Sequence, residues 1–414
     1  MAVGPWVLVV LLSLTASASY ICRVNLSVTG ALMMRDLGFS QIEMGRLFSA
    51  FVLGYALFQV PGGAAADRWG ARRTLAVAAL WWVAVTVILS ALGWGPLSRA
   101  AGSMLSLLLI VRFALGIGEG PTFPAAAQGV AKWIEVPKQG LANGIVLAAV
   151  GAGSTVAPLL LSRVMVLGGW RIATLTSAIP ALIVAVAWIS VRESKSLSSI
   201  GARPSAPARS SSRLWSPDFA LLTLSYTLQG YTVNLFVFWF YLYLVQVRHF
   251  DLLRAGTLSS LPWFLSVFAI PSGGYISDRL VASSVGLRWG RRAVPMAGLA
   301  GAGVCTVLGA RTANAYLAVA YLALATAFTL CVEGGFWASM MELAGPRTGI
   351  GGGVMNLGSN IGGLVSPALT PVLAAHLGWT NALYVAAGLS VIGAALWMGV
   401  SLNPQIEVSL PSQT

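Results

Sequence analysis

The chain has 414 residues, of which 57% are hydrophobic and only 9% are charged. An ordinary soluble domain carries about 25% charged residues, so this chain has too little charge to cover a soluble particle of its size. The composition therefore excludes a soluble enzyme, a disordered chain and a nucleic-acid-binding domain, although the formal net charge is +13. Dispersed basic residues in such an apolar chain indicate membrane orientation rather than DNA binding.

Twelve apolar segments are long enough to cross a bilayer, which takes about 20 apolar residues. In chain order the sequence predicts spans at 6–34, 43–65, 74–94, 101–124, 139–163, 172–191, 217–247, 256–278, 293–310, 314–342, 348–374 and 379–401. Strand periodicity is absent, and the runs are too long for the strands of a barrel. We therefore expect an all-α, polytopic membrane protein with twelve transmembrane helices.

The first span contains Ala16-Ser17-Ala18, which resembles a signal-peptidase site. The residues from Met1 to Pro5 include no Lys or Arg, and the apolar run continues well past the site. Both features favour a retained first helix over a cleaved signal.

Residues 192–216 interrupt the spans with a sequence rich in Ser, Pro and Arg, which is typical of a flexible linker. They separate an N-terminal six-helix bundle at 1–191 from a C-terminal six-helix bundle at 217–402, which a tail at 403–414 follows. The loops predicted on one side contain fifteen Lys and Arg residues against eight on the other. Since basic residues collect in cytoplasmic loops, we expect the linker, the tail and both termini in the cytoplasm.

The two halves repeat each other at an offset of about half the chain length. The matched pairs include Asp67-Arg68 with Asp278-Arg279, Arg68-Trp69-Gly70 with Arg288-Trp289-Gly290, Glu119-Gly120 with Glu333-Gly334, and Gly169-Trp170 with Gly378-Trp379. Two bundles in parallel repetition place a binding site between them, near the middle of the membrane.

A basic, glycine-containing loop follows the second span, with the sequence Gly63-x-x-x-Asp67-Arg68-x-Gly70-x-Arg72-Arg73. Asp67 falls at a helix end, where it can pair with cations or with a helix N-terminus of the other half. A solvated turn that only orients the chain is the alternative, but the second copy at Asp278 and Arg279 favours a gate. The motif resembles the signature loop of the major facilitator superfamily, which implies the pseudo-symmetric two-bundle fold of a transporter.

Four ionisable residues fall at membrane depth, namely Arg23, Arg112, Glu119 and Glu333. A charge there costs about 2.5–3.5 kcal/mol or more and therefore marks a functional candidate. Arg23 shares a helix face with Tyr20, and Arg112 shares one with Glu119. Two guanidiniums in a central cavity suit a carboxylate, because arginine presents a planar fork of donors. Glu119 can pair with one of them or carry a proton.

These charges also admit a structural interpretation. Arg23, Arg112 and Glu119 can form a buried network that only holds the first and fourth spans together, although one excess positive charge favours an anion site. Glu333 can simply satisfy a neighbouring helix near Gly334. Pro121 and Pro124 follow Glu119 and should kink the fourth span.

The intramembrane motifs resemble the anion:cation symporter family, which includes bacterial galactonate, hexuronate, glucarate and phthalate-type transporters. The motifs are Arg23-x-Asn25-Leu26-Ser27, Gly54-Tyr55-x-x-Phe58-Gln59-x-Pro61-Gly62-Gly63 and Arg112-x-x-x-Gly116-x-x-Glu119-Gly120. The resemblance implies substrate contacts at Tyr20, Arg23, Arg112, Trp337, Asn356 and Asn360, with proton coupling at Glu119 and Glu333. Core or lipid packing of Trp337 and helix–helix hydrogen bonds of the asparagines stay open as alternatives.

One position departs from this family, because its bacterial sugar-acid members have an aspartate where this chain has Cys22. A thiol with its ordinary pKa of about 8.5 is mostly neutral near pH 7, so half of the expected proton relay is missing. We expect any proton coupling to run through Glu119 alone, and a sodium-coupled or facilitative carrier remains an alternative.

The sequence thus predicts a secondary active transporter that takes up a sugar acid or other small carboxylate by alternating access. A drug/proton exporter of the same superfamily is the alternative, but the fifth span lacks the Gly-Pro-x-x-Gly-Gly element typical of exporters. No cofactor, metal site or enzyme is expected, because the two histidines (His249, His376) and three cysteines (Cys22, Cys305, Cys331) show no catalytic or ligand spacing. We expect a monomer in the bacterial inner membrane, with an anion, a proton or sodium, and lipid as partners and no nucleic acid.

Overall fold

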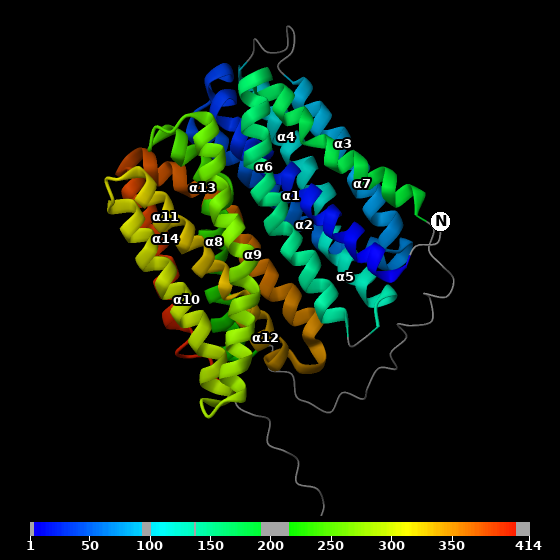
Figure 1. Cartoon of the computed structure of the whole chain (residues 1–414), viewed down its shortest axis with the longest axis vertical. Coiled ribbons are helices and arrows are strands. Elements are labelled where there is room, and N and C mark those ends of the chain that lie inside the picture. Colours follow the sequence, from blue (N-terminus) through cyan, green and yellow to red (C-terminus); the bar gives the residue numbers. More distant parts are fainter. Residues whose placement is uncertain (1–3, 93–100, 136–137, 192–214, 403–414) are drawn as a thin grey trace, which may run out of the picture.

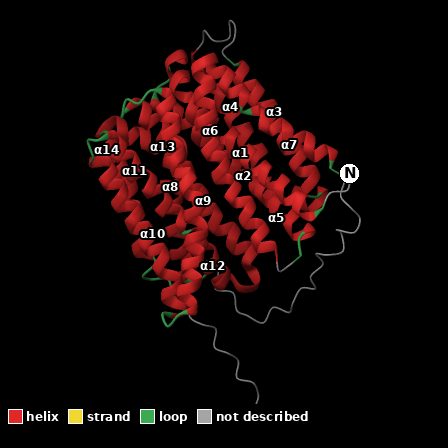
Figure 2. Ribbon diagram, in the orientation of Figure 1, coloured by secondary structure: helices red, strands yellow, loops and turns green. Residues whose placement is uncertain are grey.

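The computed structural model describes residues 4–92, 101–135, 138–191 and 215–402. Over these residues every regular element is a helix (Figure 2). The predicted linker lies outside the described residues except for its last two positions, and the predicted tail lies wholly outside them. The helices on either side end at Ser190 and begin at Pro217.

The described residues of the first half form seven helices: α1 (Pro5–Leu37), α2 (Gln41–Trp69), α3 (Ala71–Ala91), α4 (Ala101–Glu119), α5 (Thr122–Trp133), α6 (Gln139–Thr176) and α7 (Ala178–Ser190). The second half forms α8 (Pro217–Gln246), α9 (Leu252–Ala282), α10 (Gly286–Arg311), α11 (Ala315–Cys331), α12 (Glu333–Ala344), a short 3-10 turn (Gly345–Arg347), α13 (Thr348–Leu377) and α14 (Trp379–Leu396). In Figure 1 the two halves lie side by side.

Ten segments within the described ranges are long and apolar enough to cross a membrane. One of them, Leu141–Ser190, has 50 residues and is broken at Gly169, where φ is 77°, so it accounts for two crossings. The 30-residue α13 completes the twelve. The prediction of an all-α fold with twelve transmembrane helices is confirmed.

The fourth crossing differs from its predicted range of 101–124. It continues to Trp133, because α4 and α5 together form one span that is interrupted at Gly120 and Pro121. The predicted kink is present, and Pro124 lies in the first turn of α5, where a proline costs no hydrogen bond. The tenth crossing is divided in the same way, between α11 and α12.

Close helix contacts repeat between the halves. A side chain at Gly153 of α6 would overlap the backbone of Ser17 in α1, and one at Gly362 of α13 would overlap the carbonyl of Thr227 in α8. The two contacts occupy matching places in the repeat, and each requires glycine because the backbones touch. The segment around Ala16 therefore lies inside a packed helix.

The Gly-Trp pairs repeat in conformation as well as in sequence. Gly169 has a φ of 77° and Gly378 a φ of 83°, both in the left-handed region that favours glycine. The triplets Arg68-Trp69-Gly70 and Arg288-Trp289-Gly290 match in sequence but not in place. The first triplet ends α2, whereas the second lies inside α10, which begins at Gly286.

The two halves meet closely at the end of the bundle that holds the α1–α2 turn, which we call the Gly38 end. The Phe48 ring stacks on Phe238 of α8 with centroids 4.9 Å apart, and Ser49 Oγ donates to the carbonyl of Leu364 at 2.8 Å. At the opposite end, which we call the Gly70 end, α2 ends with the exposed residues Asp67, Arg68 and Trp69.

Candidate functional site

The two intramembrane carboxylates occupy the breaks of the two divided crossings. Glu119 is the last residue of α4, and Glu333 is the first residue of α12. A break in a helix is tolerated at membrane depth where the freed backbone is buried in protein or lines a cavity. Both acids therefore lie where the chain departs from regular helix near the centre of the protein.

Arg23 of α1 and Glu119 form a close ion pair. Arg23 Nη2 lies 3.0 Å from Glu119 Oε2, and Nε donates to the same oxygen at 3.1 Å. The guanidinium also lies over the rings of Tyr20 and Tyr55, 4.5 and 4.4 Å from their centroids. The Arg23 side chain keeps 12% of its surface exposed, whereas that of Glu119 keeps 1%. Arg23 is thus the more accessible member of the pair.

Arg112 of α4 lies deeper than the sequence suggested. It is fully buried and donates to Asn25 Oδ1 at 3.4 Å and to the carbonyl oxygen of Arg23 at 3.3 Å. Its guanidinium lies 4.9 Å from the centre of the Phe51 ring. Arg112 therefore contributes a second, fully buried positive charge directly behind Arg23.

This N-terminal charge cluster is not saturated by protein contacts. Arg112 Nε and Glu119 Oε1 are both buried without a hydrogen-bond partner. A buried polar atom without a partner costs about 1–3 kcal/mol, which is tolerated chiefly at functional sites. The cluster has two guanidiniums and one carboxylate, so it can accept a further negative charge.

Cys22 takes no part in the ion pair. Its thiol is fully buried and donates to the carbonyl oxygen of Ser177 at 3.3 Å. Asn25 donates to the hydroxyl of the same serine at 2.9 Å. The position that carries an aspartate in the resembled family thus holds α1 against the junction of α6 and α7.

Glu333 is held by the neighbouring helix α8. The hydroxyl of Tyr226 donates to Glu333 Oε2 at 2.9 Å, and Gln229 Nε2 donates to Oε1 at 2.8 Å. This agrees with the structural interpretation of Glu333, and its part in proton coupling stays a prediction.

Trp337 and the two asparagines lie on facing helices of the second half. Trp337, one turn after Glu333 on α12, is 38% exposed and packs beside Gly352 of α13. Asn356 and Asn360 both donate through Nδ2 to Gln59 Oε1 of α2, each at 3.0 Å. The predicted asparagines therefore make hydrogen bonds between the two halves of the protein.

The predicted gate residues of the first half lie at the Gly70 end. Asp67, Arg68 and Arg73 are exposed, and Asp67 has no ion pair within the described parts of the chain. Gly70 has a φ of 82° and ends α2. Arg72 instead donates to the carbonyl oxygens of the last turn of α7, so it caps a helix of its own half.

The second copy of the gate motif is paired differently. Asp278 forms an ion pair with Arg291, which also contacts Glu342 Oε1 at 2.9 Å. Arg279 lies over the ring of Tyr275 at 5.0 Å. Neither copy makes the predicted contact with the other half here, so gating by these residues remains a prediction.

Three residues of the predicted motifs have contacts at the site although no role was predicted for them. Asn25 accepts a hydrogen bond from Arg112, and the Tyr55 ring lies against the Arg23 guanidinium. Gln59 accepts hydrogen bonds from the asparagines of the other half. Tyr55 and Gln59 are four residues apart on α2, and two polar side chains on one face of an apolar helix were the signal. Tyr226 and Gln229 were missed altogether, because only the fold reveals that they face Glu333.

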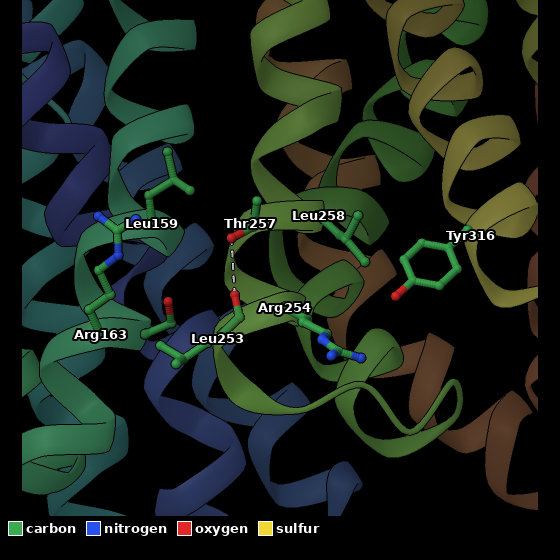
Figure 3. A pocket seen from close by; sticks show the side chains of 8 residues that line it. Leu159, Arg163, Leu253, Arg254, Thr257, Leu258 and Tyr316 are labelled. Carbon is green, nitrogen blue, oxygen red and sulfur yellow. Dashed lines mark hydrogen bonds between the residues drawn. The ribbon is translucent and has the colours of Figure 1, made fainter.

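A separate cavity of about 400 Å³ lies between α6, α9 and α11 near the Gly38 end. Figure 3 shows that Arg163 and Arg254 stand on different helices around it, with Arg254 on the side of Tyr316. None of the predicted site residues lines it. Within the described residues, no group of three or more His, Cys, Asp or Glu is placed to hold a metal ion.

Comparison with known proteins identifies the family. The profile of the Major Facilitator Superfamily matches residues 12–287. The chain belongs to this superfamily. It is 30% identical to the probable sulfoacetate transporter SauU of Cupriavidus necator, over 95% of this chain and 93% of that protein. It is 27% identical to the hexuronate transporter of Bacillus subtilis, over 92% of this chain and 91% of that protein.

Solved structures agree on the fold. A bacterial homologue of the human lysosomal transporter Spinster, inward-facing and occupied, superposes with a TM-score of 0.76 at 17% identity, over 95% of this chain and 96% of that chain. A D-xylose–proton symporter superposes with a TM-score of 0.73 at 14% identity, over 96% of this chain and 98% of that chain. The family match and the named relatives make the protein a multi-pass membrane transporter of this superfamily and not an enzyme.

Proposed function

We propose that the protein takes up a small organic anion, a sugar acid or another carboxylate, by alternating access. The observation that carries the proposal is the unsaturated cluster of Arg23, Arg112 and Glu119, whose two guanidiniums face a single carboxylate. The names of the relatives support it, since they describe transporters of sulfoacetate, hexuronate and galactarate or D-glucarate.

Arg23 is the proposed first contact of the anion. It is the partly exposed guanidinium, and its planar fork can move one or more of its N–H groups from Glu119 to a substrate carboxylate. Arg112 strengthens the site from behind, because its charge is buried and acts at short range in a medium of low dielectric constant. Tyr20 and Trp337 supply apolar faces for the carbon skeleton.

Proton coupling is proposed to run through Glu119. A proton on Glu119 cancels the charge that holds Arg23, so Arg23 becomes free to bind the anion. Proton and anion then bind together, which is what symport requires. Sodium coupling and facilitated diffusion are the alternatives. Cys22 is not proposed to carry a proton, because its thiol donates to the carbonyl oxygen of Ser177.

The contacts between the two halves at the Gly38 end, Phe48 with Phe238 and Ser49 with Leu364, fit a transporter that is closed on that side. We propose that the Gly70 end faces the cytoplasm, because the predicted spans place most basic loop residues on that side. Both termini would then be cytoplasmic. Asp67 is free to contact the other half when the Gly70 end closes.

Thermal-shift measurements on the purified protein test the anion assignment. We expect stabilisation by D-glucarate, D-glucuronate or sulfoacetate and none by neutral sugars. Arg23→Lys should remove the shift in melting temperature, because a lysine ammonium cannot replace the planar, bidentate guanidinium. Arg163→Lys is the matched control, since Arg163 is an exposed arginine outside the central cluster. Shifts with lipophilic cations but with no anion would overturn the proposal and favour a drug/proton exporter.

A further inference from the structure

One side chain of the first half holds both asparagines of the second half. Gln59 Oε1 accepts from Asn356 Nδ2 and from Asn360 Nδ2, each at 3.0 Å. A carbonyl oxygen has two lone pairs, so these two bonds use its full capacity. The asparagines are one turn apart on α13 and present their donors on the same face.

This arrangement resembles the way in which a ligand oxygen is bound. Two amide donors converge on one acceptor, and the acceptor comes from a helix of the opposite half. Gln59, Asn356 and Asn360 are all half-buried, so the cluster borders open space and is not sealed in a helix interface. An oxygen atom of a bound molecule can therefore reach the same two donors.

The cluster is adjacent to the ion pair. Gln59 lies one helical turn after Tyr55 on α2, and the Tyr55 ring is 4.4 Å from the Arg23 guanidinium. On the other side, Trp337 packs beside Gly352, one turn before Asn356 on α13. A molecule whose carboxylate meets Arg23 can thus extend a second polar group toward the asparagines.

We propose that Gln59 is a specificity-determining residue that competes with the substrate. In the empty protein its amide oxygen occupies the two asparagine donors, and a second oxygen-bearing group of the anion displaces it. Anions with a hydroxyl, a second carboxylate or a sulfonate gain these donors, whereas simple monocarboxylates do not. This inference rests on the proposed function.

The test is the affinity of purified Gln59→Ala for D-glucarate, sulfoacetate and propionate, measured by isothermal titration calorimetry. Removal of the competitor should tighten binding of D-glucarate or sulfoacetate at least fivefold, since each neutral hydrogen bond contributes about 0.5–1.5 kcal/mol. Propionate, which has no second polar group, should bind as it does to the wild type. In Gln59→Glu the added negative charge should weaken binding of the same dianions at least tenfold.

Gln41→Ala is the matched control, because it removes another hydrogen bond between the halves, from Gln41 to Gln246 at 2.6 Å, without freeing an asparagine. It should leave the affinities unchanged. The inference would be overturned if Gln41→Ala tightened binding equally, or if Gln59→Ala bound the dianions no more tightly than the wild type. In either case, anion binding by the wild type would still support the proposed function. Absence of binding of every anion to the wild type would overturn both.

Discussion

Replacement of Glu119 by glutamine separates the two roles that the Arg23–Glu119 pair can have. Glutamine keeps the shape of the side chain and an oxygen that can accept from Arg23, but it removes the charge and the site for a proton. The variant therefore imitates a permanently protonated Glu119. If Glu119 carries the coupled proton, anion binding should survive and proton-driven accumulation should not.

The size of the effect follows from the contacts. Two nitrogens of Arg23 lie 3.0 and 3.1 Å from Glu119 Oε2. Hydrogen bonds to a charged group contribute about 1.5–3 kcal/mol, against about 0.5–1.5 kcal/mol for neutral partners. The hold on Arg23 should thus weaken by about 1–2 kcal/mol, and the anion should bind about 5- to 30-fold more tightly at a pH where the wild-type carboxylate is charged.

The assay compares two modes of transport in proteoliposomes, with D-glucarate as the probe. Glu119→Gln should exchange internal for external anion at a rate close to wild type and should show no accumulation when a proton gradient is imposed. Glu135→Gln is the control, because it removes an exposed ion pair with Lys138 outside the central cluster and the predicted gate, and it should accumulate normally. Wild-type accumulation by Glu119→Gln would refute the reasoning.

Three further substitutions test other parts of the structure. Gly116→Val should lower the thermal midpoint in detergent, because its Cβ would overlap the carbonyl of Phe51 and such overpacking costs about 1–3 kcal/mol or more. In the control Gly144→Val the added side chain meets open space, so the midpoint should change little. Arg112→Leu should fold with a midpoint within a few degrees of wild type and bind anions about tenfold or more weakly; a collapse of the midpoint instead would show that Arg112 is purely structural. Asp67→Asn should slow transport in proteoliposomes with an unchanged anion affinity, since Asp67 is exposed and remote from the cluster, and unchanged rates would contradict its assignment to the gate.

The sequence alone determined the features that depend on local composition. Apolar runs of sufficient length fix the number of crossings, because a bilayer rejects unpaired backbone and charge. The repeat predicted two related halves, and charges at membrane depth identified Arg23 and Glu119 as candidates. Pro121 was enough to predict the kink after Glu119, since proline removes a backbone donor wherever it occurs.

Tertiary structure decided which of these side chains meet. The sequence treated Arg23 and Arg112 as equals, but packing buries Arg112 behind Arg23, and no local pattern records that order. Gln59 finds its partners about three hundred residues away on α13, which depends on how two separately formed bundles dock. The sequence determines the helices and the charges they carry. Only the packing of the helices makes Arg23 accessible while Arg112 is buried, and only packing places Gln59 on the amide donors of Asn356 and Asn360.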